Sequence, residues 1–591
     1  MKNLFRLFFV IFSLFFFVSC GGNENPAQNE DSGSDSTAFS LRIARDPGSS
    51  GCMNFDDCIF PNLSAINFTI FNKKEGVIYP VYNQSFPREK VKDLMKNGIT
   101  GIKNADNATL VVSVFLNDDN NHAKWQGRAG SLKFKKGETT KVDILLYPVS
   151  SQSAEVEMPK KLTTARFGHS TTVLNDGRIL VAGGFTSCGD NGNCQATESV
   201  EIIDMESGKV ETIAGMAAKR AMHTALLLND GSILFIGGVQ SFSAVQQQTA
   251  FKNYPLLPYS QSGAVTTVEK YMPPYPKFNM MENNLGTPVE NYTESVSVPE
   301  EIAFMTFQSI LAKRISDSQI DVFLVGGVDA DDNPSNKTYK FTVTDSTTEN
   351  GSVSISEVKK FAETSSPMLL PVLAYSDGAV LAVGGRPSAP EKTTEETTEE
   401  SGEETAEETK TTEVAASLIS ENESRDIETG TGNNIFFANS MALDDALYTF
   451  AGMPNKSGTL ENSKENGVTR KWSLSDGSME IFDKNENILK SSGGNVAFAG
   501  TLYDSEKNRF ILVGGTSAEN KYQVINATDL EIAVREMTDK RIMPTVSMVH
   551  SSYFDVKEVS EKPQDIIVII GGTSAPNNTG SAANTIKINI L

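Results

Sequence analysis

The sequence predicts an all-β chain in which seven four-stranded sheets close into a ring and follow a small β-sandwich. Two observations predict the ring. RFGHSTTVLNDGRILVAGG at 166–184 is nearly repeated as RAMHTALLLNDGSILFIGG at 220–238, and an apolar run ending in Gly-Gly recurs along the rest of the chain. A third observation predicts the sandwich: before residue 150, short runs rich in β-branched residues alternate with Asn, Asp and Gly clusters.

Residues 1–19 are expected to be a secretory signal peptide, because a basic start precedes an apolar run, 7–18, that is too short to span a bilayer comfortably. The run then resembles the lipobox of bacterial lipoproteins, although Phe17 stands where that family usually has Leu. The resemblance implies cleavage before Cys20, which would carry diacylglycerol and an acyl chain such as palmitate and hold the protein on a membrane. Gly21 after the cysteine favours the outer membrane of the cell envelope, with either face possible. An ordinary leader that contains a cysteine is the alternative.

Two segments are expected between this leader and the repeats. A flexible tether is predicted at 20–37, which has no large apolar side chain after the cysteine. A β-sandwich, immunoglobulin-like in a loose sense, is predicted at 38–150 from runs such as AINFTIF, TLVVSVFL and KVDILLY. NDDNN at 117–121 is expected to be a polar hairpin turn, with calcium ligation as the alternative.

The other four cysteines form two closely spaced pairs, Cys52 with Cys58 and Cys188 with Cys194. In an oxidising compartment this spacing predicts two local disulfides. Zinc is the alternative, but it needs three or four clustered ligands, and neither pair has a neighbouring His or a second pair. We therefore expect no metal and no cofactor apart from the lipid.

Each repeat within 151–591 predicts one antiparallel four-stranded sheet. HSTTVL and ILVAGG flank Asn175-Asp176-Gly177, residues that tolerate the positive φ of a tight hairpin turn. SVEIIDMESGKVETI at 199–213 supplies two more strands. Such a sheet cannot cover its own faces, so it needs neighbours like itself.

Glycines that end an apolar run mark seven such units. These repeat-defining glycines are Gly183, Gly184, Gly237, Gly238, Gly326, Gly327, Gly384, Gly385, Gly452, Gly514, Gly515, Gly571 and Gly572. The units resemble the kelch repeat of galactose-oxidase-like β-propellers over roughly residues 152–591, although the tryptophan common late in kelch blades is missing from most of them. The resemblance implies a seven-bladed kelch-type β-propeller.

Two inserts and a closing strand complete the predicted ring. Residues 241–300, rich in Tyr, Pro, Asn and Gln, predict an irregular excursion around one strand at VEKYM. The Thr/Glu-rich tract within 386–432 predicts a disordered loop. Because TIKINIL ends the chain three strands into its unit, SAEVEM at 153–158 is expected to supply the fourth strand and to close the ring.

Few residue types in the repeats suggest catalysis. His169 and His223 recur in register, which favours a structural role because a catalytic residue is needed only once. We find no copper-oxidase cluster of His and Tyr, no sialidase Asp-box, no phosphate loop and no nucleophile elbow. A kelch-type sugar mutarotase would need a Glu and an Arg facing the channel, and Arg386 is one conceivable member.

The sequence therefore predicts a non-catalytic, membrane-anchored binding scaffold whose partner is a protein or a glycan. The insert at 241–300 is expected either to contact that partner or merely to pack on the ring. The net charge of −22 argues against nucleic acid. The alternative is a mutarotase-like, epimerase-like or glycan-active enzyme at the channel mouth. Converging Arg, Glu and Tyr side chains at a mouth would favour the enzyme, and an apolar or plugged mouth would favour the scaffold.

Overall fold

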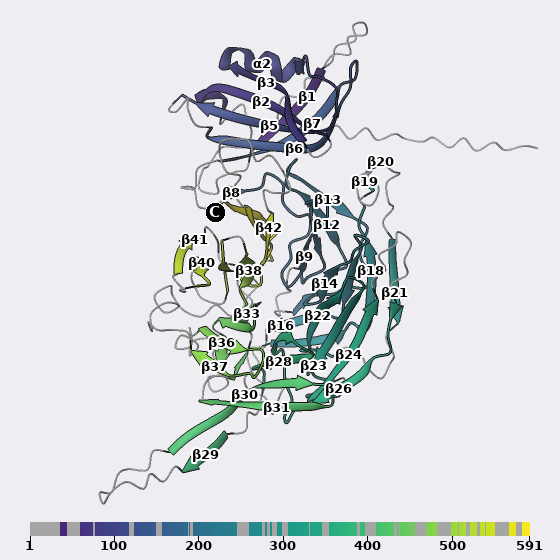
Figure 1. Cartoon of the computed structure of the whole chain (residues 1–591), viewed down its shortest axis with the longest axis vertical. Coiled ribbons are helices and arrows are strands. Elements are labelled where there is room, and N and C mark those ends of the chain that lie inside the picture. The colour runs from purple at the N-terminus through teal and green to yellow at the C-terminus, as the bar shows by residue number, and fades with distance from the viewer. Residues whose placement is uncertain are drawn as a thin grey trace, which may run out of the picture. The chain divides into compact units, whose positions relative to one another are not determined.

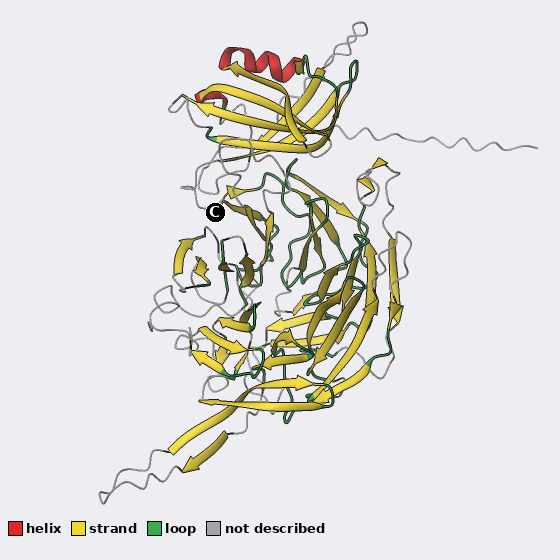
Figure 2. Cartoon of the chain, viewed as in Figure 1, coloured by secondary structure: helices red, strands yellow, loops and turns green. Residues whose placement is uncertain are grey.

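The computed structural model forms two compact units, whose described residues fall within 36–148 and 156–590. The residues that it describes are 36–43, 59–74, 77–117, 123–148, 156–186, 188, 193–244, 259–274, 278–279, 284–285, 292–297, 305–329, 331, 333–344, 354–386, 391–395, 409–430, 434–436, 438–450, 452–454, 469–481, 498–505, 507–515, 521–528, 532–537, 539, 541–549, 566–574 and 582–590. Nearly all of their regular structure is β-strand (Figure 2). Within these ranges, no helix combines the length and the apolarity needed to cross a membrane.

The N-terminal unit is a seven-stranded sheet with one α-helix (Figure 1). Its strands pair in the order β3 (Val77–Pro87), β2 (Leu63–Lys74), β5 (Ala105–Leu116), β6 (Trp125–Phe134), β7 (Thr140–Pro148), β1 (Ser36–Ile43) and β4 (Ile99–Thr100), and a short 3-10 turn, η1 (Phe60–Asn62), precedes β2. The expected sandwich of two separate sheets is wrong in this respect, because β6 pairs with β7 through Trp125 and Gln126 and makes the pairing continuous. Ser36 and Thr37, which composition assigned to the tether, belong to β1.

One apolar core supports this unit. Alternate residues of the paired strands β2 and β5, including Phe68 and Val112, point into it because successive strand side chains face opposite sides of a sheet. Helix α2 (Arg88–Asn97) adds Val91 and Leu94 to the same core.

The second unit contains seven antiparallel sheets of at least four strands each among its described residues. From the first strand of each outward, these are sheet 1, β9 (Ser170–Val173), β10 (Ile179–Ala182), β12 (Val200–Asp204) and β13 (Lys209–Ile213); sheet 2, β14 (Thr224–Leu227), β15 (Ile233–Ile236), β18 (Thr267–Met272) and β21 (Tyr292–Ser297); sheet 3, β22 (Ser309–Ser316), β23 (Gln319–Val325), β24 (Lys337–Thr344), β25 (Ser354–Ile355) and β26 (Lys359–Glu363); sheet 4, β27 (Val372–Ser376), β28 (Ala379–Val383), β30 (Thr409–Ser420), β29 (Glu391–Glu395) and β31 (Glu423–Gly430); sheet 5, β33 (Asn439–Leu443), β34 (Ala446–Phe450), β36 (Thr469–Ser473) and β37 (Met479–Ile481); sheet 6, β38 (Gly500–Asp504), β39 (Arg509–Val513), β40 (Lys521–Asn526) and β41 (Ile532–Glu536); and sheet 7, β42 (Thr545–Val549), β43 (Ile566–Ile570), β44 (Ile586–Ile590) and β8 (Val156–Glu157). Two short pairs, β19 (Phe278–Asn279) with β20 (Asn284–Leu285) and β32 (Ile435–Phe436) with β35 (Met453–Pro454), accompany them.

The seven first strands contact one another in sequence order. Each lies beside the first strand of the following sheet, and β42 of sheet 7 lies beside β9 of sheet 1 (Figure 1). The second strands, such as ILVA at 179–182, are entirely buried because neighbouring sheets cover both of their faces. The predicted closing strand is confirmed: in β8, Val156 pairs with Ile588 and Glu157 pairs with Lys587.

Both predicted inserts contain regular structure, so their boundaries were wrong. Residues 241–300 include β18 and β21 of sheet 2, together with most of a further hairpin, β16 (Val239–Ala244) and β17 (Tyr259–Ala264). The segment 386–432 contains β30 and β31, because the apolar residues 414–419 follow the Thr/Glu tract directly and are buried in sheet 4. The charged composition of the tract concealed this strand.

The glycine pairs link consecutive sheets. Gly183 and Gly184 both have positive φ, +63° and +95°, and the Gly184 N–H donates to the carbonyl of Arg220, in front of sheet 2, at 2.9 Å. A methyl group on Gly183 would overlap that carbonyl. The same bond recurs between Gly327 and Met368, Gly385 and Ile435, Gly515 and Arg541, and Gly572 and Arg166.

Candidate functional site

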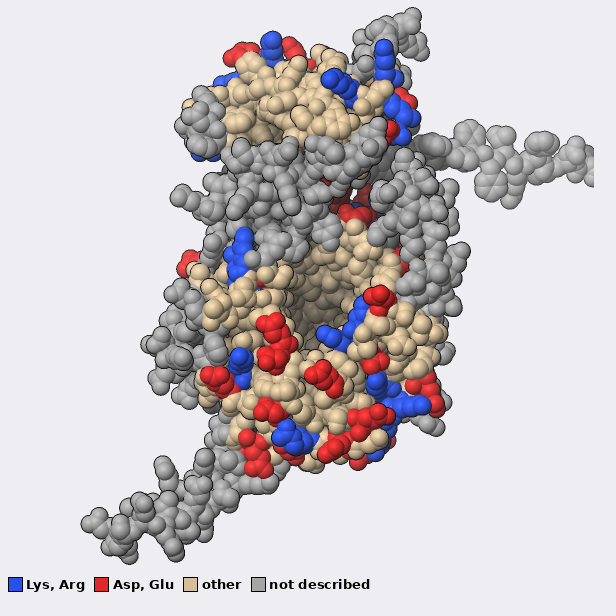
Figure 3. Space-filling view, viewed as in Figure 1, with Lys and Arg blue, Asp and Glu red and all other residues tan. Residues whose placement is uncertain are grey.

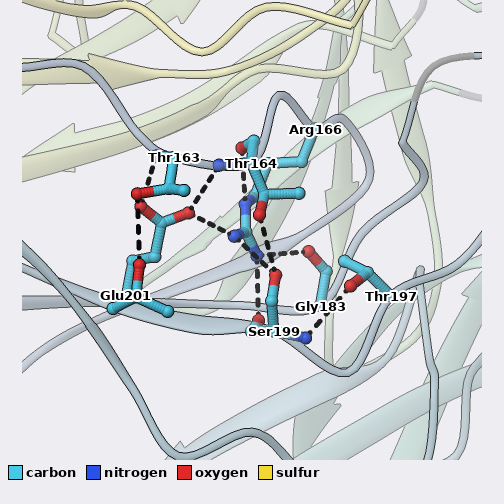
Figure 4. Close-up of polar contacts among 8 residues, drawn as sticks. Thr163, Thr164, Arg166, Gly183, Thr197, Ser199 and Glu201 are labelled. Carbon is cyan, nitrogen blue, oxygen red and sulfur yellow. Dashed lines mark hydrogen bonds and ion pairs between the residues drawn. The ribbon is translucent and has the colours of Figure 1, made fainter. Parts of the chain in front are cut away.

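Buried arginines hold the sheet entrances, by which we mean the residues just before each first strand. The Arg166 guanidinium is fully buried and donates to the carbonyls of Gly183 and Ser199, at 2.8 and 3.0 Å, and to the Glu201 carboxylate at 2.6 Å (Figure 4). Glu201 also accepts the backbone N–H groups of Thr163 and Thr164, at 2.6 and 3.0 Å. This clamp joins the entrance of sheet 1 to the ends of β10 and β12.

Sheet 2 repeats the clamp with Arg220 and Glu269. The Arg220 guanidinium donates to the Gly237 carbonyl at 2.9 Å and to the Glu269 carboxylate at 3.1 Å, and both side chains are fully buried. Burial lowers the pKa of Arg220, while the charge of Glu269 raises it. Because each charge is satisfied inside the protein, the clamps have a structural role.

Other sheets build the same junction with different residues. In sheet 7, Arg541 donates to the Gly571 carbonyl, and Lys587 forms an ion pair with Asp539 at 2.9 Å. In sheet 4, Arg386 is fully buried, donates to Ser417 and forms an ion pair with Asp426 at 3.1 Å. The suggestion that Arg386 faces a channel as part of a sugar-converting site is therefore wrong.

The two register-matched histidines lie between sheets. The imidazole Nε2 of His169 is 2.7 Å from the Thr545 hydroxyl of sheet 7, and that of His223 is 2.8 Å from the Ser170 hydroxyl of sheet 1. Burial lowers the pKa of both rings, to about 3 for His223, and the charge of Arg220 lowers it further. Both rings are therefore neutral at physiological pH. His122 and His550 lie outside the described residues.

The entrances share one backbone geometry. In six sheets, the residue two places before the first strand has a positive φ: Gly168, Met222, Phe307, Leu370, Phe498 and Met543. Several of these residues are joined in a chain of hydrogen bonds, because the Met222 N–H donates to the Gly168 carbonyl at 2.7 Å and the Met543 N–H donates to the Phe498 carbonyl at 2.8 Å. The left-handed residues thus bring the entrances of neighbouring sheets together.

An apolar cluster occupies this end of the cycle of sheets. It contains residues from the entrance of every sheet and from the loops that follow the glycine pairs, including Phe167, Phe185, Ala221, Val239, Phe242, Phe307, Val328, Leu369, Phe436, Phe498, Ile542 and Met543. Phe167, Phe185 and Phe242 contact one another, with ring centroids 5.2–6.0 Å apart. We call this group the entrance plug.

A three-stranded sheet joins the plug. It pairs in the order β11 (Asn193–Gln195), β16 and β17, and we call it the cap. The Cys188–Cys194 disulfide that the spacing predicted is present beside it, whereas Cys20, Cys52 and Cys58 lie outside the described residues. The Gln261 amide of β17 accepts the Phe307 N–H at 2.9 Å and lies 2.9 Å from the Met222 sulfur. This glutamine replaces the direct backbone bond between sheets 2 and 3.

The first strands carry little charge. Among their described residues, the charged ones are Lys313, Arg314 and Asp504. Arg314 donates to the Asp317 carbonyl at 3.0 Å, and Asp504 forms an ion pair with Arg509 at 2.8 Å. Figure 3 shows a hollow between these strands, and its visible wall consists mainly of residues other than Lys, Arg, Asp and Glu. In the described part of the chain, no three His, Cys, Asp or Glu residues gather closely enough to hold a metal ion.

Sequence reasoning identified the histidines but missed the clamps. The signal was present: an Arg lies three residues before each His, and a Ser or Thr two residues before a Glu recurs at Ser199–Glu201 and Thr267–Glu269. Each clamp joins residues more than thirty positions apart, so neither half alone indicated its partner.

The comparisons with known proteins give one finding. The family model described as Kelch motif matches residues 166–217, which contain the Arg166 clamp and all four strands of sheet 1. No curated protein matches the chain. The chain is thus a nearly all-β protein that contains a Kelch motif, and such a repeat suggests a protein-binding or propeller scaffold.

Proposed function

We propose that residues 151–591 form a seven-bladed kelch-type β-propeller that acts as a non-catalytic binding scaffold for a protein or a glycan. The cyclic contacts of the seven first strands support the propeller, together with the bond that β8 adds to the last sheet. The Kelch motif in sheet 1 supports a scaffold.

The entrance plug is the single observation that carries the non-catalytic part. Enzymes on rings of this kind place converging polar side chains at a channel mouth, whereas here the entrances meet in an apolar cluster. The repeated Arg, Glu and His side chains are used up in contacts within and between sheets. The alternative remains an enzyme acting on a sugar at the opposite end of the ring, where the hollow lies.

The same proposal includes the location of the protein. Lipid on Cys20 after removal of 1–19 would hold it on a membrane of the bacterial cell envelope, and the outer membrane is favoured by Gly21. The N-terminal unit would separate the scaffold from that membrane.

A ligand screen followed by product analysis tests the function. Protein beginning at residue 21, which retains β1, is applied to a glycan array and to a pull-down from envelope extracts. The expected result is a ligand that is retained and recovered unchanged. Conversion of a retained sugar would establish the enzyme instead. Mass spectrometry of the membrane-derived protein tests the lipid, because the expected N-terminal residue is an acylated Cys20.

A further inference from the structure

The two faces of the cap differ in chemistry. Cys194 of β11, Phe242 of β16 and Gln261 of β17 are paired across the strands, and their side chains face the entrance plug. Because strand side chains alternate between faces, their neighbours point away from the plug. These outward neighbours are Asn193, Gln195, Ser241, Ser243 and Ser262.

The outward residues form a grid of amides and hydroxyls. Gln195, Ser241 and Ser262 make one cross-strand row, and Asn193 and Ser243 lie in the next. Asn193, Gln195 and Ser262 are exposed. The grid has no charged member and no apolar side chain, although the whole chain has a net charge of −22. We call these five residues the polar grid.

The polar grid is held rigidly from behind. Phe242 and Cys194 are 2% and 1% exposed in the plug, and the disulfide to Cys188 ties down the edge strand β11. Gln261 attaches β17 to the entrance of sheet 3. Side chains fixed in this way lose little conformational freedom when they bind, which increases affinity for a ligand that makes many weak hydrogen bonds.

We infer that the polar grid is a binding surface for an uncharged polysaccharide; this inference rests on the proposed scaffold function and specifies its ligand. Amide and hydroxyl groups can both donate and accept, which matches the vicinal hydroxyls of a neutral sugar. A protein partner would need aromatic or apolar anchors, which the grid lacks. An acidic polymer would be repelled by the net charge of the chain.

Affinity electrophoresis of the full chain in neutral detergent tests this inference, with dextran, mannan and a mixed-linkage β-glucan as neutral probes and polygalacturonate as the acidic one. At least one neutral probe is expected to retard the protein. Gln195→Glu with Ser262→Asp is expected to weaken that retardation at least tenfold, because two carboxylates replace neutral groups on the grid. The matched control, Gln319→Glu with Ser316→Asp, adds the same charge at exposed positions of sheet 3 and should leave retardation unchanged.

Three results would overturn the inference: no retardation by any neutral probe, equal retardation by polygalacturonate, or an undiminished effect in the grid variant. The third result, with the polysaccharide recovered intact, would remove the grid and leave the scaffold function standing. Cleavage or conversion of the probe would remove the scaffold function itself. Equal melting temperatures of the grid variant and its control establish that loss of retardation comes from the surface and not from unfolding.

Discussion

At the scale of single residues, the buried clamps link charge to stability. Removing one partner of a buried ion pair leaves an uncompensated charge, which commonly costs about 3–5 kcal/mol. Glu201→Gln keeps an oxygen for the Thr163 and Thr164 N–H groups but removes the charge beside Arg166. We therefore predict that the free energy of unfolding of the second unit falls by about 3 kcal/mol in urea denaturation.

The control for this prediction is Glu357→Gln. Glu357 pairs with Lys359 at 4.0 Å, and both side chains are at least 75% exposed, so its free energy of unfolding should not change measurably. Equal effects of the two substitutions would show that the Arg166–Glu201 charge pair does not stabilise the fold.

The histidines between sheets predict how stability depends on pH. The pKa of His223 is lowered from 6.5 to about 3 in the folded protein, so the unfolded chain takes up a proton at a higher pH than the folded one. The contribution of this ring to stability is therefore fully present above about pH 6.5 and declines as the pH falls toward 3. Melting temperatures measured between pH 7 and pH 4 should fall less steeply for His223→Gln than for the unchanged protein. Parallel profiles would contradict the assignment.

At the scale of elements, the first glycine of each pair allows two sheets to meet. Gly183 has a φ of +63°, and a methyl group there would overlap the Arg220 carbonyl and lie 2.9 Å from the His223 ring. Gly378, in a hairpin turn of sheet 4, has a φ of +86° but no atom near that position. Gly183→Ala should therefore lower the melting temperature much more than Gly378→Ala, whose cost is limited to about 1 kcal/mol of backbone strain. Similar losses would show that close contact between the sheets is unimportant.

Sequence reasoning predicted elements whose signals are local. Asp176-Gly177 fixes a hairpin turn through its own backbone preferences, and the Gly-Gly ending marks where a buried second strand stops. The method failed where the signal is distant or mixed. The cap lies in a segment whose polar outward residues conceal the inward Phe242, and β30 combines a Thr/Glu-rich start with buried residues at 414–419. Only the pairing of the folded chain separates the two faces of such strands.

At the scale of the whole molecule, the closed cycle of the second unit depends on a short junction. Strand β8 comes from the start of this unit and completes sheet 7, and the Met158 N–H donates to the Ile586 carbonyl of β44 at 2.9 Å. Sheet 7 in turn contacts sheet 1 through the hydrogen bond between Thr545 and His169. Loosening β8 should therefore expose both sides of one seam while the other six remain covered.

Met158→Pro tests this closure because proline has no N–H to donate to Ile586. Met158→Ala is the matched control, since it loses the buried side chain but keeps the bond. Hydrogen exchange followed by mass spectrometry should show faster exchange in β44 and β42 for the proline variant than for the alanine variant, with β5 and β23 unchanged in both. Equal exchange in the two variants would show that the β8 hydrogen bond does not close the cycle. Faster exchange in all seven sheets would show that the second unit opens as a whole, so that closure is a property of the complete cycle and not of one seam.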